Sequence, residues 1–379
     1  MERMMHLSAE QCNTRLRWTG RTLFDEIRNA VFFNWTCAGF LVRFYGTRLK
    51  LELIATAERY PGEGDNLPWL AAFLDGAEEP FRTFSLCEGE NTVQLFESGV
   101  PEEHTLQIVK LSEGSKGRAG LSGLSLEGEL LPLPEKNKRR KIEFVGDSIT
   151  CGFGNEMTPE ETMFSSEREN GLLAYGAVAS RLLNAEFQCV CVSGIPLCWA
   201  KDENYRIVLP WVPEFETSVR TMEGYYEFAD RCHEEAEGKT ENFTRWEFSR
   251  FVPDAVVLNL GTNDAFRIRV SGNDPAEAAH FQARYGAFLE RVRALNGPNA
   301  WIVCTLGSMD YYLYDNIEKA AEAYQVKTGD EKVRCMKFGA IDPWGEGFGG
   351  LNHPNWKTQT RMGNELAAFL EPLLQEKKL

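Results

Sequence analysis

Ser148 stands where an apolar run of the sequence ends, in the stretch Gly146-Asp-Ser-Ile-Thr150. A serine in a tight turn at the carboxyl end of a strand can present its hydroxyl above a sheet. Backbone amides nearby can then stabilise a developing oxyanion. This arrangement suits nucleophilic attack on an acyl carbonyl. Ser and Asp are also frequent helix caps, so the motif alone does not separate a nucleophile from a cap.

Two further positions could complete an oxyanion hole. Gly194 follows the apolar run 187–192, and a glycine there lets a backbone N–H approach a ligand closely. Asn263 follows the run 255–260, and its amide can donate to an oxyanion, which a carboxylate cannot do. Each has an ordinary alternative, because glycine ends many strands and Asn and Asp are common in turns. We assign that turn role to Asp264.

His353 is the candidate general base, because an imidazole has an unperturbed pKa near neutrality. It lies in the loop Gly349-Gly-Leu-Asn-His-Pro354, just before a predicted helix. The other histidines lie in the first third of the chain or in charged or helical surroundings. A lone histidine is usually structural. The residue chemistry of Ser148, Gly194, Asn263 and His353 together indicates a serine hydrolase.

The elements that must position these residues form an alternating pattern after residue 136. Apolar strands are predicted at 141–145, 187–192, 255–260 and 301–306, and helices at 172–183, 275–295, 315–326 and 355–374. Such alternation predicts an α/β fold, with a parallel sheet covered by helices on both faces. Ligands bind beyond the carboxyl ends of the strands in open sheets of this kind, and three of the four candidate residues follow strand ends.

The chain before residue 135 has a different pattern. Short apolar or alternating runs recur between turn signals at 30–35, 40–45, 49–54, 92–96 and 104–109. Short strands at such spacing predict an all-β sandwich. Residues 131–141 contain two prolines followed by a basic run, which indicates a solvated connector. We therefore predict a β-sandwich domain over residues 1–135 and an α/β domain over residues 136–379.

Composition excludes several classes of function. The formal net charge of -15 argues against a nucleic-acid partner, because phosphate binding needs a basic surface. Neither a signal peptide nor an apolar run long enough to span a membrane is evident. The ten cysteines are scattered without a Cys-x-x-Cys pair or a Cys/His cluster, so we expect neither a disulfide framework nor a metal site. These features predict a cytoplasmic protein.

The four ordered elements resemble the SGNH, or GDSL-type, hydrolases, whose signature residues correspond to Ser148, Gly194, Asn263 and His353. Further stretches are similar to family 2 carbohydrate esterases: Gly20-Arg-Thr22, Phe33-Asn-Trp35, Phe44-Tyr-Gly-Thr47, Gly146–Gly154, Trp246-Glu-Phe-Ser249, Pro253-Asp254 and Asn259–Asp264. The resemblance spans most of the chain and implies a jelly-roll domain ahead of a flavodoxin-like SGNH domain. It also implies a carboxylic ester hydrolase that removes acetyl groups from xylan- or mannan-type oligosaccharides through an acetyl-enzyme, without a cofactor.

One departure from the family concerns the residue that orients His353. Most SGNH enzymes carry an aspartate three residues before the histidine, and some family 2 esterases carry the acid two residues before. Gly350 and Leu351 occupy these positions here. The nearest acidic candidates are Asp342 and Glu346. We favour a Ser–His dyad in which a backbone carbonyl accepts from His353.

Aromatic side chains that follow strands or lie near His353 are candidates to stack on a sugar ring. Trp199 and Trp344 are the first choices, followed by Tyr311 and Phe348. The ordinary alternative for each is core packing or anchoring of a loop.

Two other functions fit the same residues. A lipase, thioesterase or short-chain acylhydrolase of the same superfamily would have an apolar acyl tunnel. A glycan-binding protein with a degenerate hydrolase domain would explain the missing aspartate. The sequence does not specify the oligomeric state.

Overall fold

The computed structural model describes residues 4–60, 63–134, 139–158, 160–198, 220–270 and 272–375. The chain forms two compact units. Unit 1 comprises residues 1–138, Met163–Leu172 and Phe228–Trp246, and unit 2 comprises the remainder. The domain limits predicted from the sequence, 1–135 and 136–379, group these two later segments with the α/β domain, and those limits stay a prediction.

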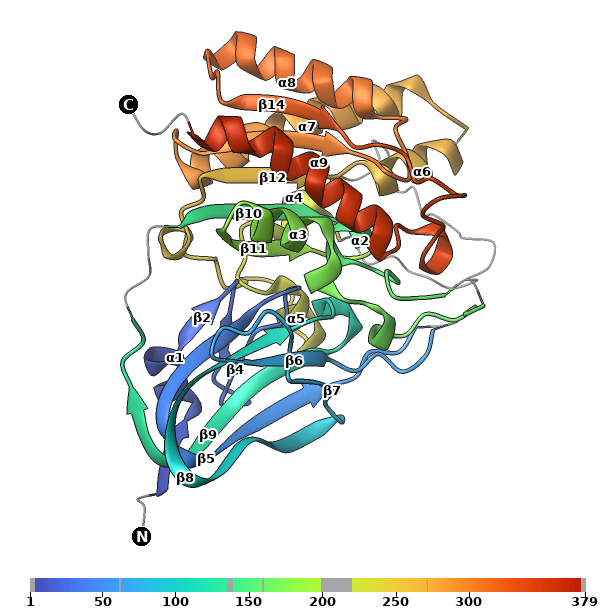
Figure 1. The fold of residues 1–379 in the computed structure, drawn as a ribbon. Coiled ribbons are helices and arrows are strands. Elements are labelled where there is room, and N and C mark those ends of the chain that lie inside the picture. The colour runs from blue at the N-terminus through green and yellow to red at the C-terminus, as the bar shows by residue number, and fades with distance from the viewer. Residues whose placement is uncertain are drawn as a thin grey trace. The chain divides into compact units, whose positions relative to one another are not determined.

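Unit 2 is built on a parallel sheet, which in the described residues has the order β11-β10-β12-β13-β14 (Figure 1). The strands are β10 (Arg140–Gly146), β11 (Ala185–Cys191), β12 (Ala255–Asn259), β13 (Trp301–Leu306) and β14 (Val333–Lys337). In chain order this is 2-1-3-4-5, the flavodoxin-like arrangement. The predicted α/β class and the four predicted strands are confirmed. The prediction missed β14, an edge strand that contains two basic residues and has only Val333 buried.

Helices cover both faces of this sheet (Figure 1). The helices α3 (Tyr175–Leu182) and α9 (Trp356–Gln375) pack together on one face, and α7 (Pro275–Asn296) and α8 (Tyr314–Thr328) pair on the other. On the α3/α9 face, strand residues such as Phe144 form one buried apolar cluster with helix residues such as Leu366. Complete burial of such a side chain contributes about 1.5–3 kcal/mol, so this core is what holds the strand ends in place.

Shorter elements of unit 2 connect the strands to the site. They are α2 (Ser148–Cys151), α4 (Met222–Tyr225), α6 (Thr262–Val270) and the 3₁₀ helices η4 (Phe248–Arg250) and η5 (Gly350–Asn352). The 3₁₀ helix η3 (Gly171–Leu173) lies where the chain passes from unit 1 back to unit 2.

Unit 1 contains an antiparallel sheet with the order β3-β4-β9-β5-β8-β6-β7, to which β1 adds at β9 and β2 at β5. The strands are β1 (Met4–Ser8), β2 (Arg17–Thr19), β3 (Leu23–Asp25), β4 (Ala30–Phe32), β5 (Gly39–Thr56), β6 (Trp69–Leu74), β7 (Arg82–Ser85), β8 (Gly89–Lys110) and β9 (Arg118–Leu131). The helices are α1 (Ala9–Arg15), α5 (Arg231–Ala236), η1 (Gly114–Lys116) and η2 (Ser166–Arg168). The all-β class is confirmed, and the jelly-roll topology stays a prediction.

The expectation of short strands was wrong for the centre of this sheet. The runs 40–45 and 49–54 belong to one strand, β5, and the runs 92–96 and 104–109 belong to β8. The register shifts between Gly46 and Arg48, so β5 is irregular there without ending. Gly46 pairs with Gly128, and a Cβ atom at Gly46 would lie 2.2 Å from the Glu127 carbonyl oxygen. The glycine read as a turn signal therefore serves close strand contact.

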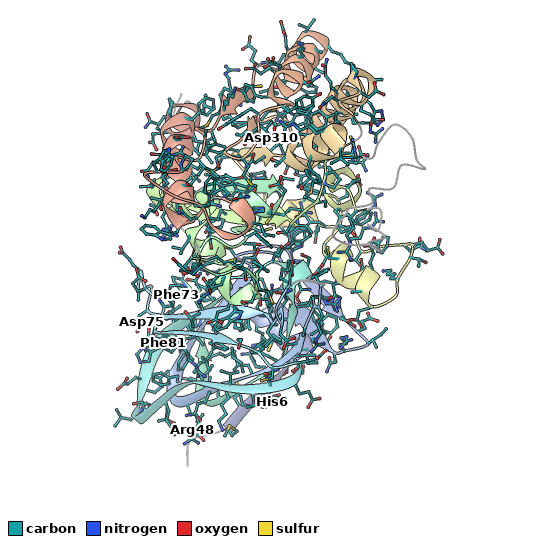
Figure 2. All side chains as sticks on the ribbon, turned by 90° about the vertical axis from the view of Figure 1, so that its right-hand side faces the viewer. His6, Arg48, Phe73, Asp75, Phe81 and Asp310 are labelled. Atoms are coloured by element: carbon teal, nitrogen blue, oxygen red, sulfur yellow. The ribbon has the colours of Figure 1, made fainter. Side chains whose placement is uncertain are left out.

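Alternation along β5 separates a buried face from a polar one. Leu49, Leu51 and Leu53 are buried, whereas the residues between them are partly exposed. Arg48, labelled in Figure 2, donates to Glu97 and Glu127 on the two neighbouring strands. Such exposed pairs stabilise a sheet by at most about 1 kcal/mol each, so burial on the opposite face dominates.

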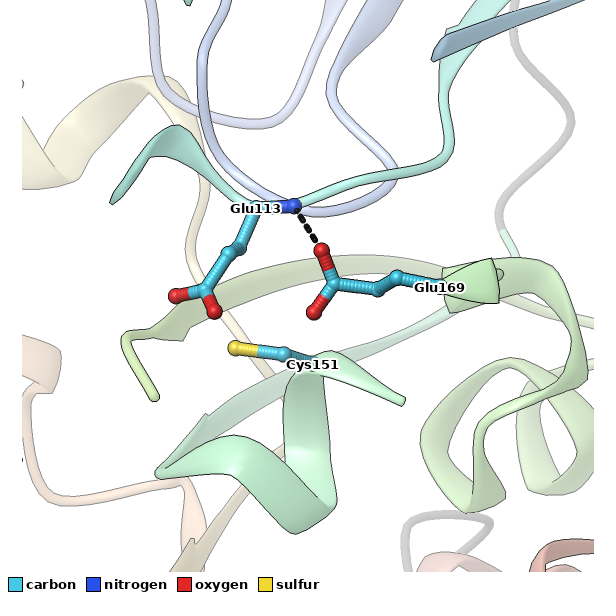
Figure 3. Close-up of side chains that lie close together, drawn as sticks. All are labelled: Glu113, Cys151 and Glu169. Carbon is cyan, nitrogen blue, oxygen red and sulfur yellow. Dashed lines mark hydrogen bonds between the residues drawn. The ribbon is translucent and has the colours of Figure 1, made fainter. Parts of the chain in front are cut away.

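The segment Met163–Leu172 is held within unit 1 by hydrogen bonds. The Ser166 hydroxyl donates to the Leu67 carbonyl at 2.6 Å, and the Gly171 N–H donates to the Leu111 carbonyl at 2.9 Å. The Glu113 N–H donates to the Glu169 carboxylate at 2.9 Å (Figure 3). These bonds join segments distant in sequence, which is why residue patterns did not reveal them.

The segment Phe228–Trp246 also packs within unit 1. The Asn34 amide donates to the Asp230 carboxylate at 2.6 Å, and the Trp35 indole N–H donates to the Ala229 carbonyl at 2.7 Å. His233 is buried, with Nε2 2.9 Å from the Asp25 carboxylate. The histidine therefore has a structural role, as expected from its surroundings.

The helices and the cysteines bear on two expectations from the sequence. Among the described residues, no helix is both long and apolar enough to cross a bilayer. All ten cysteines lie in the described ranges, and none is joined in a disulfide. Cytoplasmic placement stays a prediction.

Candidate active site

The strand register brings three of the candidate positions to one edge of the sheet. Gly146 at the end of β10 lies opposite Cys191 at the end of β11 and Asn259 at the end of β12. The chain segments that follow these three residues therefore leave the sheet side by side. They carry Ser148, Gly194 and Asn263, respectively.

Ser148 is the first residue of α2, directly after β10. The Asp147 carboxylate accepts from the Ile149 N–H at 3.0 Å and caps this helix. A Cβ atom at Gly146 would lie 2.0 Å from the Thr150 hydroxyl oxygen, so only glycine permits this tight turn. Asp147, rather than Ser148, therefore caps this helix. Ser148 occupies the position where the backbone N–H has no intrahelical acceptor.

His353 lies beside Ser148, although 205 positions separate them in the sequence. The distance from His353 Nε2 to Ser148 Oγ is 2.8 Å, which is a hydrogen bond. The Phe153 ring packs against the imidazole, with ring centroids 4.8 Å apart. The two residues that sequence reasoning selected for proton transfer therefore lie in direct contact.

Backbone carbonyl groups face the other imidazole nitrogen. His353 Nδ1 lies 3.0 Å from the Gly350 carbonyl oxygen and 3.3 Å from that of Leu351. A neutral imidazole with its proton on Nδ1 donates there and leaves Nε2 free to accept from the serine. Leu351 and Asn352 have φ values of +49° and +62°, a conformation that is uncommon for residues other than glycine. This double left-handed turn directs the carbonyls back toward the ring.

The two acidic candidates have other partners. The Glu346 carboxylate accepts from the Arg361 Nε at 2.5 Å and from the Thr358 hydroxyl at 2.7 Å, which ties the histidine loop to α9. The Asp342 carboxylate accepts from the Trp344 N–H at 3.0 Å. Both side chains therefore stabilise the loop that precedes His353.

A close contact between glycines fixes this loop on the nucleophile side. The Gly350 N–H donates to the Gly154 carbonyl at 2.9 Å. Gly154 has a φ of +59°, and a Cβ atom there would lie 2.9 Å from the Gly350 Cα. A Cβ atom at Gly350 would lie 2.3 Å from the Met157 sulfur. A side chain at position 350 would therefore require the Met157 side chain to move.

Burial shifts the pKa of two groups at the site. It lowers the pKa of His353 to about 4, and the Gly350 and Leu351 carbonyls offset part of that effect. The imidazole is therefore neutral at pH 7 and able to accept a proton. Burial also raises the pKa of Asp147 to about 7, and the Asp264 carboxylate adds to this rise.

Gly194 lies in the loop that follows β11, and Asn263 lies in the first turn of α6. Gly194 has a φ of +77°, with open space where a side chain would be. Asn263 Nδ2 donates to the Ile195 carbonyl at 3.1 Å, and the Asp147 carboxylate lies 3.4 Å away. Both amide protons thus have protein acceptors, the second at long distance. A role for either residue as an oxyanion donor stays a prediction.

Asp264 does not lie in a turn, as the sequence suggested, but within α6. It is fully buried and accepts from the N–H groups of Leu197 and Cys198. The residues around Asp264 gave no signal for this contact, because its partners are backbone groups of another loop.

The aromatic candidates differ in their surroundings. Trp344 is 96% exposed, and Phe348 is 38% exposed and pairs with Pro354 in a β-bridge. Tyr311 is half-buried and donates to the Phe338 carbonyl at 2.8 Å, which fits a loop anchor. Trp199 lies outside the described residues. Trp356, at the start of α9, is 50% exposed and was not among the aromatic candidates.

Two protein-family models match this chain, one in each part of the sequence. The model of GDSL-like Lipase/Acylhydrolase matches residues 142–366. The model of Carbohydrate esterase 2 N-terminal matches residues 18–134.

The curated relatives are named as esterases or deacetylases. The chain is 28% identical over 375 residues to Cellulase/esterase CelE of Acetivibrio thermocellus, covering 96% of this chain and 40% of that protein. It therefore spans less than half of that relative. It is 27% identical over 323 residues to an Acetylxylan esterase / glucomannan deacetylase of Cellvibrio japonicus, covering 84% of this chain and 80% of that protein.

A solved structure has a similar fold over nearly the whole chain. It is a family two carbohydrate esterase from Clostridium thermocellum in complex with cellohexaose. The TM-score is 0.75 at 28% identity, covering 95% of this chain and 99% of that chain.

Proposed function

The chain belongs to the GDSL-like lipase/acylhydrolase family, and we propose that it removes O-acetyl groups from a carbohydrate by means of Ser148 and His353. It is a carboxylic ester hydrolase and is most like the family 2 carbohydrate esterases. The observation that carries the proposed mechanism is the 2.8 Å contact between His353 Nε2 and Ser148 Oγ.

Ser148 Oγ attacks the acetyl carbonyl carbon while His353 Nε2 accepts the hydroxyl proton. The tetrahedral intermediate collapses, His353 donates that proton to the departing sugar oxygen, and an acetyl group stays on Ser148. Water then attacks this acetyl-enzyme with His353 as base again, and acetate leaves. Proton transfer and nucleophile are supplied by these two side chains, so the sequence of steps needs no metal or organic cofactor.

Backbone carbonyls take the place of the usual acid in this mechanism. The Nδ1 proton of His353 bonds to the Gly350 and Leu351 carbonyl oxygens, which hold the ring in the tautomer that leaves Nε2 basic. The partial charge of a carbonyl stabilises the imidazolium less than a carboxylate does. In the proposed Ser–His dyad the imidazole is therefore oriented correctly, but the imidazolium is stabilised less than in a triad.

The Ser148 and Gly194 N–H groups and the Asn263 amide would stabilise the oxyanion, each at about 2.7–4 kcal/mol. Asn263 has one proton bound firmly to Ile195 and one at 3.4 Å from the Asp147 carboxylate. The second bond is long and weak, so that proton is the one available to the oxyanion.

The substrate we propose is an acetylated xylan- or mannan-type oligosaccharide. The names of the relatives, acetylxylan esterase and glucomannan deacetylase, support this class. The net charge of -15 fits a neutral sugar better than an anionic one. Trp344 and Phe348 lie on the loop that carries His353 and offer exposed aromatic surface on which a sugar ring could stack.

Acetate release from acetylated xylo- and manno-oligosaccharides tests the proposal. Wild type should release acetate, and Ser148→Ala should release none above background. Equal hydrolysis of p-nitrophenyl octanoate and acetate, or a preference for the octanoate, would instead support a lipase- or thioesterase-type enzyme. Binding of the oligosaccharide without any acetate release would support a glycan-binding protein.

A further inference from the structure

One loop of unit 2 is contacted by three residues of a single helix. The loop covers residues 192–198, follows β11 and carries Gly194. The helix is α6, which follows β12 and carries Asn263, Asp264 and Arg267 near its start. Each of these three side chains bonds to a backbone group of the loop.

Asp264 and Arg267 hold the far end of the loop. The Asp264 carboxylate accepts from the Leu197 N–H at 2.8 Å and, through its other oxygen, from the Cys198 N–H at 3.3 Å. Arg267 Nη1 donates to the Cys198 carbonyl at 2.6 Å. Asp264 is fully buried and Arg267 nearly so. Hydrogen bonds to charged groups are stronger than those between neutral groups.

The near end and the middle of the loop are fixed separately. The Val192 N–H donates to the Gly146 carbonyl, and the Ile195 N–H donates to the Val192 carbonyl. Asn263 Nδ2 donates to the Ile195 carbonyl. The backbone N–H groups of Met222 and Glu223 donate to the Pro196 and Leu197 carbonyls. The backbone carbonyls of Leu197 and Cys198 thus accept from the Glu223 N–H and from Arg267. The N–H groups of the same two residues donate to Asp264.

Gly194 lies between these fixed points, with a φ of +77°, and a Cβ atom there would have no neighbour within 4 Å. No side chain restrains its peptide plane, so the orientation of that plane depends on the turn closed by the Ile195 N–H and on the residues that follow. Rotation of that plane would turn the Gly194 N–H away from the oxyanion. Donors must already point at the developing charge to stabilise it well, so the constraints on residues 195–198 determine how well this one can act.

We infer that Asp264 and Arg267 are positioning residues that hold the Gly194 amide toward the oxyanion through the loop 195–198. This inference rests on the proposed function. Neither side chain touches the substrate. Their contribution reaches the reaction only through the hydrogen bond from Gly194 and therefore lowers the barrier rather than binding the sugar.

The test compares p-nitrophenyl acetate with p-nitrophenyl thionoacetate, in which sulfur replaces the carbonyl oxygen. Sulfur is a weak hydrogen-bond acceptor, so the thiono ester gains little from an oxyanion hole. The ratio of kcat/KM for the acetate to kcat/KM for the thionoacetate therefore measures how much the oxyanion donors contribute. In Asp264→Asn, an NH₂ group replaces one carboxylate oxygen, and this group cannot accept from the backbone N–H that it faces. We expect this variant to lower the ratio at least about tenfold, mainly through kcat for the acetate.

Two further comparisons keep the test interpretable. Asp274→Asn changes the exposed cap of α7, far along the chain from this loop, and should leave the ratio unchanged because Asn caps as well as Asp. If Asp264→Asn does not fold, Arg267→Met should lower the ratio, and Arg267→Lys, which can still donate to the Cys198 carbonyl, should restore most of it. Thermal unfolding of each variant measures its structural integrity.

The outcomes separate the inference from the proposed function. A folded Asp264→Asn or Arg267→Met enzyme that loses rate equally on both esters, with an unchanged ratio, would overturn the inference. If Ser148→Ala hydrolyses the acetate as fast as wild type does, the proposed function fails. An inactive Ser148→Ala together with an unchanged ratio in the α6 variants would remove the inference alone.

Discussion

His353 Nδ1 lies 3.0 Å from the carbonyl oxygen of Gly350, the position at which most SGNH enzymes carry an aspartate. The backbone of that residue therefore makes the contact that a carboxylate makes elsewhere. A Cβ atom at Gly350 would meet the Met157 sulfur at 2.3 Å, so an aspartate there would require the Met157 side chain to move.

The acid limb of the pH–rate profile should lie unusually low. Burial lowers the pKa of His353 from 6.5 to about 4, and the mechanism needs the neutral imidazole. Activity should therefore rise with pH through about 4 and be level above it, rather than rising through about 6.5. The measurement is kcat/KM on p-nitrophenyl acetate against pH. Asp147→Asn should keep this limb, because Asn caps α2 and does not titrate. A limb near 6.5 would contradict the assignment.

Asp342→Asn and Glu346→Gln should reduce kcat by less than about tenfold each, because neither carboxylate contacts His353 in the described geometry. Loss of a triad aspartate costs about 10⁴-fold in comparison. Glu346→Gln should also lower the melting temperature, because it weakens the bonds to Arg361 and Thr358. His353→Ala is the reference for complete loss. A fall in kcat near that of His353→Ala in either acid variant would show that a distant acid completes a triad.

Gly154→Ala should displace the histidine loop. Gly154 has a φ of +59°, and its new Cβ would lie 2.9 Å from backbone atoms of Gly350, which cannot move without carrying His353 along. A shift of about 1 Å in a catalytic group can cost about 10²-fold, so we expect a loss of that order in kcat. The matched control is Gly286→Ala within α7, where a Cβ atom meets nothing within 4 Å. That variant should be more stable by about 0.5–1 kcal/mol and fully active.

Rates and unfolding curves measured on both glycine variants decide between positioning and general destabilisation. Full activity of a folded Gly154→Ala enzyme would show that the contact with Gly350 does not position His353.

Trp344→Ala should weaken binding of acetylated oligosaccharides without affecting the chemical step. Trp344 is 96% exposed, so its removal costs little stability and takes away only surface available to a ligand. KM for the oligosaccharide should rise, while kcat and the KM for p-nitrophenyl acetate stay unchanged. Ile27→Ala, at the equally exposed Ile27 of unit 1, is the control and should change neither value. An unchanged oligosaccharide KM would remove Trp344 from the substrate site.

The sequence predicted what depends on local pattern and on chain order. Apolar runs bounded by turn residues gave β10, β12 and β13 within one residue at each end, because buried parallel strands are apolar on both faces. Ser148 and His353 were selected by residue type and by their place next to a strand end or a glycine-bounded turn. The parallel register then brought the strand ends together.

Features that depend on contacts between distant backbone groups could not be predicted in this way. The left-handed turn begins at Leu351, a residue type that does not favour this conformation, so composition gave no signal there. The long strand β5 was divided at Gly46 because a glycine that permits close strand contact looks the same in sequence as a turn glycine. Asp264 was misplaced for a similar reason, since the amides that it binds belong to residues 66 and 67 positions away.

The most direct measurement is acetate release from acetylated oligosaccharide by wild type, Ser148→Ala and His353→Ala, with unfolding curves to show that all three are folded. The account predicts turnover by wild type and a loss of about 10⁶-fold in kcat for either variant, because the two side chains act as one unit. Release at the wild-type rate by a folded Ser148→Ala enzyme would contradict it.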